Sequence, residues 1–211
     1  MSLNNMMVSP HWLASEIGSG IMKSGGNAVE AMIASAAVIS VVYPHMNSLG
    51  GDNFWLISDK EFNVKAIDSS GYSAKKATIA FYSNKGFKTI PTRGPLSALT
   101  VPGAVAGWEK AFQFSKNKLG GTKTLDELLE PAEFISSNGF AITNSLEKNL
   151  RLKKNELKNQ NNFFQKFYKN NYNVGDILKF PEMSETFKVL KKNGLRDFYN
   201  GTIFKKIIAD L

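Results

Sequence analysis

The chain has 211 residues, of which 43% are hydrophobic and 11% aromatic, and this composition excludes a wholly disordered protein. It contains no cysteine, which excludes disulfides and thiol catalysis, and its two histidines, His11 and His45, cannot form a zinc site by themselves. The formal net charge is +8 at pH 7, but lysines interspersed with asparagines in the second half carry most of it, which favours a solvated surface over a nucleic-acid-binding groove.

The start of the chain and its most apolar run do not indicate export or membrane insertion. Residues 1–7 lack a basic segment followed by an apolar one, so no secretory signal is predicted and we expect a cytoplasmic location. The apolar run 28–42 is shorter than the roughly 20 residues of a membrane span and contains Glu30. We therefore expect neither a membrane nor a nucleic acid among the partners.

The first half of the chain combines helical and strand patterns. Apolar residues at every fourth position from 13 to 21 predict an amphipathic helix that ends at a glycine pair. Asn27 is a typical N-cap for a buried helix over 28–42. Alternating apolar and polar residues then predict a β-hairpin with strands over 54–58 and 62–68.

An irregular, turn-rich segment separates this half from a largely helical second half. A polar stretch over 155–162 predicts a loop, and neither a repeat nor a linker is visible, so we expect one domain over 1–211 with no internal boundary. Apolar helix and strand faces without a visible partner predict poor solubility of the isolated chain. The expected helices cover 105–114, 124–137 with a capping box, 143–155, 184–193 and 197–211.

Single motifs say little about chemistry. Nucleotide-binding loops and histidine pairs at metal-ligand spacing are missing from the sequence, so we expect no cofactor and no metal. The turn Gly50-Gly51-Asp52 permits two interpretations, a tight turn that needs glycine or backbone amides that approach an anion.

The order and spacing of several short segments are more specific than any one of them. The succession resembles the first subunit of the gamma-glutamyltransferase family over about residues 6–211. The segments are, in chain order, GGNAVEA at 25–31, PH at 44–45 with LGG at 49–51, VPGAVAGW at 101–108, PA at 131–132 with NGF at 138–140, and DFYNG at 197–201.

This resemblance implies an α+β fold, the αββα sandwich of N-terminal-nucleophile hydrolases, of which this chain is the incomplete front portion. Members are made as proenzymes that cut themselves before a threonine, whose freed amine serves as base for its own hydroxyl. The cut lies downstream of the DFYNG segment in this family, so the resemblance places the nucleophile beyond Leu211. The implied partners are the missing C-terminal half of the same proenzyme and a small amide substrate, with a possible homodimer of processed heterodimers.

The threonines that the chain does contain lie in capping or turn contexts, and we expect them to be structural. No catalytic residue is therefore predicted here, and the chain alone is expected to be inactive.

One departure from the family bears on the substrate. Gamma-glutamyl enzymes carry an Arg-Glu pair after the second strand, whereas this chain has Ser70 and Gly71 there. A neutral serine cannot form the two-pronged contact that an arginine makes with a carboxylate. We expect Ser69, Ser70, Gly71 and Tyr72, together with Arg93, to line the substrate side of the pocket.

Other segments resemble the oxamate amidohydrolase-like branch, whose members hydrolyse a small amide that bears a carboxylate. They are VYPHMN at 42–47, GGDNFWLI at 50–57 and IPTRGPL at 90–96. Arg93 is the candidate to bind that carboxylate, or else an exposed turn arginine. His45 either lines the pocket or is structural.

The sequence thus predicts the N-terminal part of an autoprocessed amidohydrolase acting on an oxamate-like amide. Two alternatives stay open at this point. The protein could be a glutathione hydrolase or gamma-glutamyl transferase with a relocated carboxylate clamp, or a non-catalytic scaffold subunit.

Overall fold

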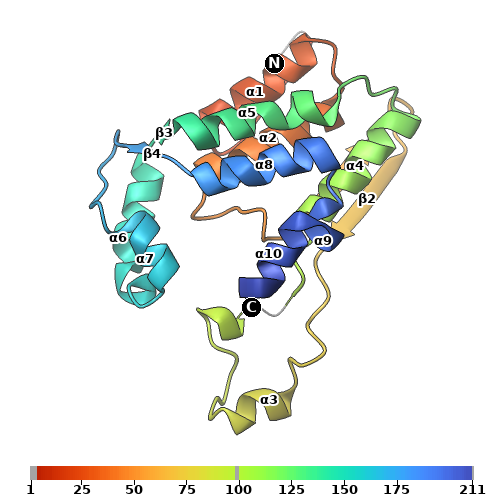
Figure 1. The fold of residues 1–211 in the computed structure, drawn as a ribbon. Helices are drawn as coiled ribbons and strands as arrows, with labels where there is room; N and C mark the ends of the chain where they lie inside the picture. The colour runs from red at the N-terminus through yellow and green to blue at the C-terminus, as the bar shows by residue number, and fades with distance from the viewer. Residues whose placement is uncertain (1–3, 98–99, 211) are drawn as a thin grey trace.

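The computed structural model describes residues 4–97 and 100–210, and most of these residues are helical (Figure 1). The segment predicted as one helix over 197–211 forms two helices with Gly201 between them, and its last residue, Leu211, lies outside the described residues. The elements are α1 (Trp12–Lys23), α2 (Ala28–Val42), β1 (Asn53–Ser58), β2 (Val64–Ser69), α3 (Ile79–Asn84), a 3-10 turn (Pro95–Ser97), α4 (Ala104–Lys118), α5 (Leu125–Asn138), β3 (Phe140–Ala141), α6 (Asn144–Leu157), α7 (Asn161–Phe167), β4 (Ile177–Leu178), α8 (Pro181–Asn193), α9 (Asp197–Asn200) and α10 (Thr202–Asp210).

Helix α2 is the centre of the core, as its apolar sequence predicts. It packs against α1, α4 and α5, and α5 packs against α8, so these helices lie side by side (Figure 1). The side chain of Asn27 accepts hydrogen bonds from the amides of Val29 and Glu30 and starts the helix where the sequence predicts. The helix ends at Val42, two residues before Pro44, which cannot continue it.

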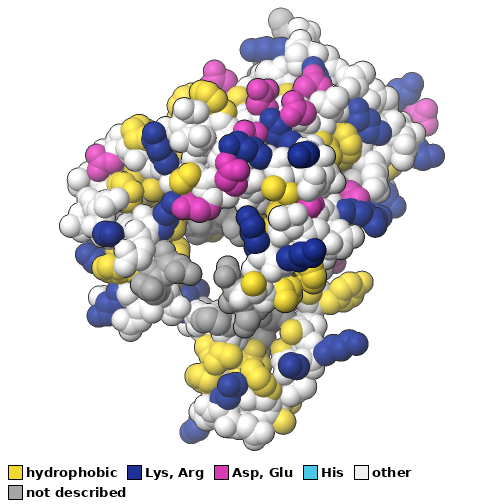
Figure 2. Space-filling view, in the orientation of Figure 1, with side chains coloured by type: hydrophobic (Ala, Val, Ile, Leu, Met, Phe, Trp, Pro, Cys, Tyr) yellow, Lys and Arg dark blue, Asp and Glu magenta, His cyan; other side chains and the backbone are white. Residues whose placement is uncertain are grey.

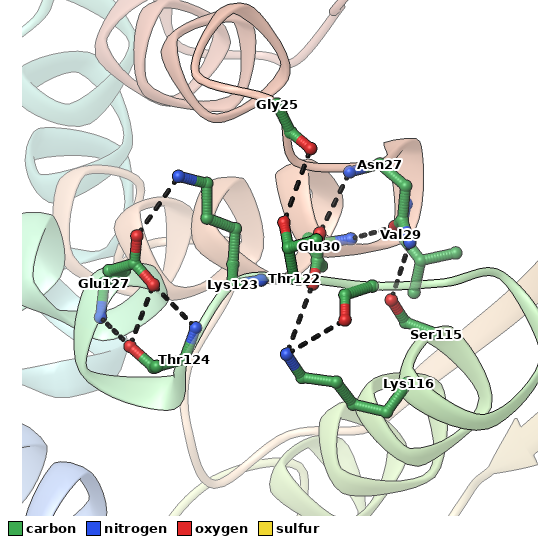
Figure 3. Close-up of polar contacts among 11 residues, drawn as sticks. Gly25, Asn27, Val29, Glu30, Ser115, Lys116, Thr122, Lys123, Thr124 and Glu127 are labelled. Atoms are coloured by element: carbon green, nitrogen blue, oxygen red, sulfur yellow. Dashed lines mark hydrogen bonds and ion pairs between the residues drawn. The ribbon is translucent and has the colours of Figure 1, made fainter.

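A buried carboxylate ties the start of α2 to the loop between α4 and α5 (Figure 3). Glu30 is fully buried, and its Oε2 accepts from the Asn27 amide at 2.9 Å while Oε1 accepts from the Lys123 amide at 2.8 Å. The Lys116 ammonium lies 3.8 Å from Oε1. These partners satisfy a charge that would otherwise be costly to bury.

The predicted hairpin is present, with β1 and β2 antiparallel and Asn53 paired with Ser69. Its second strand begins at Val64 rather than at Phe62 as predicted, because Phe62 lies in the turn with a φ of 64°. Trp55 and Ile57 are buried on the face that α4 covers. On the opposite face Phe54 and Leu56 are 72% and 83% exposed.

The described strands form less sheet than the resemblance implies. In the described ranges the strands form two separate two-stranded sheets, β1–β2 and β3–β4, and not the stacked pair of larger sheets that a complete αββα fold contains. The described residues form layers of helices, the β1–β2 hairpin and one two-residue strand pair.

The second half contains elements that the sequence did not predict. The polar stretch over 155–162 is largely helical, because α6 continues to Leu157 and α7 begins at Asn161. Helix α3 and the two-residue strands β3 and β4 were also not predicted. No helix in the described part of the chain has the length and apolar character needed to cross a bilayer.

Charged side chains of both signs are intermingled over the helical body in Figure 2, which shows one face of the molecule. Hydrophobic side chains gather around α3, which extends away from the body (Figures 1 and 2). The exposed Ile79 belongs to this segment. The intermingled charges differ from the continuous basic stripe that is typical of a nucleic-acid-binding surface.

Candidate functional site

Two of the family-like segments and the segment that departs from the family meet at one junction. The loop before β1, the segment after β2 and the loop before α4 are joined by hydrogen bonds from backbone amides. The Gly71 amide donates to Asp52 Oδ1 at 3.2 Å, and the amides of Gly103 and Ala104 donate to the Gly51 carbonyl at 3.0 and 2.8 Å. Segments distant in sequence therefore form one wall, which consists of residues 51–52, 69–72 and 101–104.

This wall is so tightly packed that it requires glycine at two positions. A Cβ on Gly71 would lie 1.5 Å from the Val101 carbonyl oxygen, and a Cβ on Gly103 would lie 1.8 Å from that of Ser69. Both contacts involve backbone, which cannot move aside as a side chain can. The glycines are thus explained by close backbone approach.

A fourth segment fixes the junction from the other end of the chain. Tyr199 in α9 donates its hydroxyl to the Pro102 carbonyl at 2.8 Å and accepts from the Ala106 amide at 2.9 Å. Burial raises the pKa of Tyr199, so the hydroxyl stays protonated and able to donate. The DFYNG segment therefore holds the start of α4 in place.

The predicted residues 69–72 lie at this junction, with different exposure. Ser69 is buried, whereas Tyr72 is 89% exposed and its carbonyl accepts from the Val101 amide. Ser70 donates its hydroxyl to Asp68 Oδ1 at 2.7 Å, and its amide donates to the same oxygen at 2.8 Å. Both hydrogen bonds lower the pKa of Asp68 and hold Ser70 in the turn.

His45 and Arg93 line one cavity of 350 Å³ beside α6. The His45 Nε2 lies 3.0 Å from the Ser145 hydroxyl, and its ring centroid is 4.1 Å from that of Tyr43. Nδ1 is buried without a hydrogen-bond partner among the described residues. Burial lowers the pKa of His45, so the ring is neutral near pH 7.

Arg93 is held at this cavity by two partners. Its Nε lies 3.2 Å from Glu156 Oε2, and its Nη1 donates to the Thr92 carbonyl at 3.0 Å. The segment 69–72 does not line this cavity. His45 also lines a second cavity together with Asp52, the residue that accepts from the Gly71 amide. His45 therefore links the cavity of Arg93 to the junction that contains residues 69–72.

Sequence reasoning missed the connecting residues Asp52 and Tyr199. Both belong to segments that carried the family resemblance, but their roles are contacts between segments, which no spacing along the chain reveals. Among the described residues no cluster of three His, Cys, Asp or Glu could hold a metal ion.

Three threonines are N-caps, as predicted, with hydroxyls that accept from helix amides. Thr78 accepts from Phe81, Thr124 from Glu127 and Thr143 from Leu146. The Thr124 hydroxyl also donates to Glu127 Oε2 at 3.0 Å within the capping box, so these hydroxyls hold helix ends.

Comparison with known proteins agrees with the family resemblance of these segments. The sequence profile of the gamma-glutamyltranspeptidase family matches residues 14–211. The chain belongs to this family. It is 38% identical over 209 residues to the oxamate amidohydrolase proenzyme of Klebsiella pneumoniae subsp. pneumoniae, an alignment that covers 98% of this chain and 39% of that protein. The glutathione hydrolase-like YwrD proenzyme of Bacillus subtilis is 36% identical, with 98% and 38% covered.

Solved structures of gamma-glutamyltranspeptidases have the same fold. The enzyme from Helicobacter pylori superposes with a TM-score of 0.89 at 29% identity, and the match covers all of this chain and 60% of that one. The predictions of this family and of an α+β N-terminal-nucleophile hydrolase fold are confirmed. The chain spans less than two fifths of the length of the two proenzymes above.

Proposed function

We propose that this chain is the N-terminal part of an autoprocessed amidohydrolase that cleaves a small carboxylate-bearing amide of the oxamate type. Its nucleophile would be a threonine downstream of Leu211. The similarity to an oxamate amidohydrolase proenzyme supports the substrate class, and the chain's share of that protein, 39%, leaves room for a downstream nucleophile.

The observation that carries the proposal is the placement of the cationic group. After β2, where gamma-glutamyl enzymes have an arginine, Ser70 is neutral and its hydroxyl is engaged by Asp68. Arg93 instead lines a cavity with His45, next to the cavity that reaches Asp52. In this proposal Arg93 binds the substrate carboxylate, while Ser69, Ser70, Gly71 and Tyr72 form the wall on the substrate side.

The second partner in this proposal is the downstream part of the same proenzyme. The outer face of the β1–β2 hairpin exposes Phe54, Leu56 and Val64, and a two-stranded sheet is marginally stable by itself. A cavity of 390 Å³ along β1 continues this apolar surface towards α2. Strands of the downstream part would bury this face and supply the nucleophile next to the junction.

The test uses the complete protein, assayed for ammonia release from oxamate and for nitroaniline release from a gamma-glutamyl nitroanilide. We expect turnover of oxamate and little of the nitroanilide, and replacement of Arg93 by Ala should raise the KM for oxamate. Turnover of the nitroanilide alone would favour a glutathione hydrolase activity, like that named for the Escherichia coli relative, which is 30% identical. An unchanged KM would remove Arg93 from the site.

A further inference from the structure

The cavity beside His45 is cationic in its lining. Arg93 and Lys153 both contribute to it, and the other described residues that line it are apolar or neutral, among them Leu150, Leu157 and Phe163. A volume of 350 Å³ lies within the range of small-molecule sites. Two cations beside an apolar wall suit a small organic anion better than a neutral ligand.

Both cations form ion pairs with one carboxylate, that of Glu156, which does not itself line the cavity. Glu156 in α6 lies 3.2 Å from Arg93 Nε through Oε2 and 2.7 Å from Lys153 Nζ through Oε1. The hydrogen bond from Lys153, with a smaller contribution from Arg93, lowers the pKa of Glu156. Glu156 is therefore ionised near neutral pH and acts as an internal anion.

We propose that Glu156 competes with the ligand's carboxylate for Arg93 and Lys153, and that a small organic carboxylate in the cavity displaces Glu156 from these two cations. The inference rests on the proposed role of Arg93 and adds Lys153 and Glu156 as residues that determine specificity.

The geometry makes this exchange inexpensive. The side chains of Arg93, Lys153 and Glu156 are 47%, 44% and 43% exposed, and ion pairs in such positions contribute little because water screens them. Arg93 meets Glu156 through Nε while Nη1 faces the Thr92 carbonyl, so the pair is not the two-pronged contact that an arginine can make with a carboxylate. Once displaced, Glu156 returns to solvent and no buried charge is left behind.

The ion pairs of Glu156 weaken the binding of every ligand that needs Arg93 and Lys153. A ligand must compete with Glu156, so a carboxylate that engages both cations gains more than one that engages a single cation. Glu156 thereby selects for an anionic ligand whose carboxylate reaches both Arg93 and Lys153 while its uncharged part contacts the apolar wall.

The experiment measures binding of oxalate, a planar carboxylate that an amidase cannot hydrolyse, to the complete protein by calorimetry. Glu156→Gln should tighten binding about two- to fivefold, because the ligand no longer has to break an exposed ion pair and such a pair contributes about this much. Arg93→Met should weaken it about tenfold or more, because charge-assisted hydrogen bonds are lost. Glu185→Gln is the matched control, since Glu185 forms an exposed pair with Lys188, also three residues apart on one helix. It should leave binding unchanged.

Glu156→Ala provides a second variant should the Gln side chain retain a hydrogen bond to Arg93. Unchanged or weaker binding in both Glu156 variants relative to Glu185→Gln would overturn the inference, as would oxalate that binds none of the proteins. Failure of the proposed function looks different, because oxamate would then not be hydrolysed even where oxalate binding responds to Glu156 as expected.

Discussion

At the scale of single residues, protonation of His11, which caps the start of α1, makes the stability of the protein depend on pH. Its Nδ1 accepts from the Leu13 amide at 3.3 Å and caps the helix, while Nε2 is buried without a described partner. Burial lowers the pKa of His11 from its usual 6.5, so the folded protein keeps the ring neutral where the unfolded chain begins to bind a proton. The contribution to stability is complete above about pH 6.5 and is lost as the pH falls through the folded pKa.

We therefore expect the Tm of the complete protein to fall between pH 7.5 and pH 5, and Asn in place of His11 to flatten this dependence. Asn can cap the helix and does not titrate in this range. Thermal unfolding followed by circular dichroism measures the effect. His45→Gln serves as a comparison, because burial lowers the pKa of His45 as well. A pH dependence that His11→Asn leaves intact would contradict this role.

Gly103 is a residue whose neighbours allow no side chain. In Gly103→Ala the new methyl would meet the Ser69 carbonyl, and we expect a loss of about 1–3 kcal/mol or more in the free energy of unfolding. Gly20→Ala is the control, because Gly20 lies exposed in α1 and a methyl group there would have no neighbouring atom within 4 Å, so this variant should gain up to about 1 kcal/mol. Urea unfolding measures both variants, and equal changes in the free energy of unfolding for Gly103→Ala and Gly20→Ala would refute the close approach at the junction.

At the scale of elements, Glu30 joins α2 to the α4–α5 loop (Figure 3). Glu30→Ala removes the acceptor for the amides of Asn27 and Lys123, and we expect the free energy of unfolding to fall by about 3–5 kcal/mol. Glu127→Ala is the matched control, since Glu127 has the same capping-box position in α5 but is exposed. The free energy of unfolding should fall clearly less in Glu127→Ala than in Glu30→Ala. Urea unfolding at neutral pH compares the two, and similar losses would show that burial of Glu30 adds nothing.

At the scale of the whole molecule, the outer face of the hairpin decides how the chain behaves alone. Phe54 and Leu56 lie on a face that no described helix covers, so the isolated chain should aggregate. The double variant Phe54→Ser and Leu56→Thr should raise the solubility of the isolated chain and reduce processing of the complete proenzyme. Leu152→Ser is the control, because Leu152 is 65% exposed on α6, away from the hairpin. A well-dispersed unaltered chain with a sharp unfolding transition would argue against an uncovered interface.

Local patterns were enough to predict several elements. Asn27 and the apolar run that follows predict α2 residue by residue, because a cap, a run of helix-forming residues and a proline are all local signals. The capping box at Thr124 likewise starts α5 where expected. Helices α3 and α7 were missed because each is short and its sequence is not periodic enough to be distinguished from a loop.

The sequence by itself determined the family, the helical layers and the absence of an arginine after β2, because short segments and their order are properties of the chain. Only the tertiary structure decided that Asp52, Gly71, Gly103 and Tyr199 meet, and that Glu156 in α6 reaches Arg93. Those contacts join residues far apart along the chain, and no local propensity encodes them. The contacts at the junction form because α2, α4 and the hairpin bury their apolar faces together, which brings the loops between them to one place.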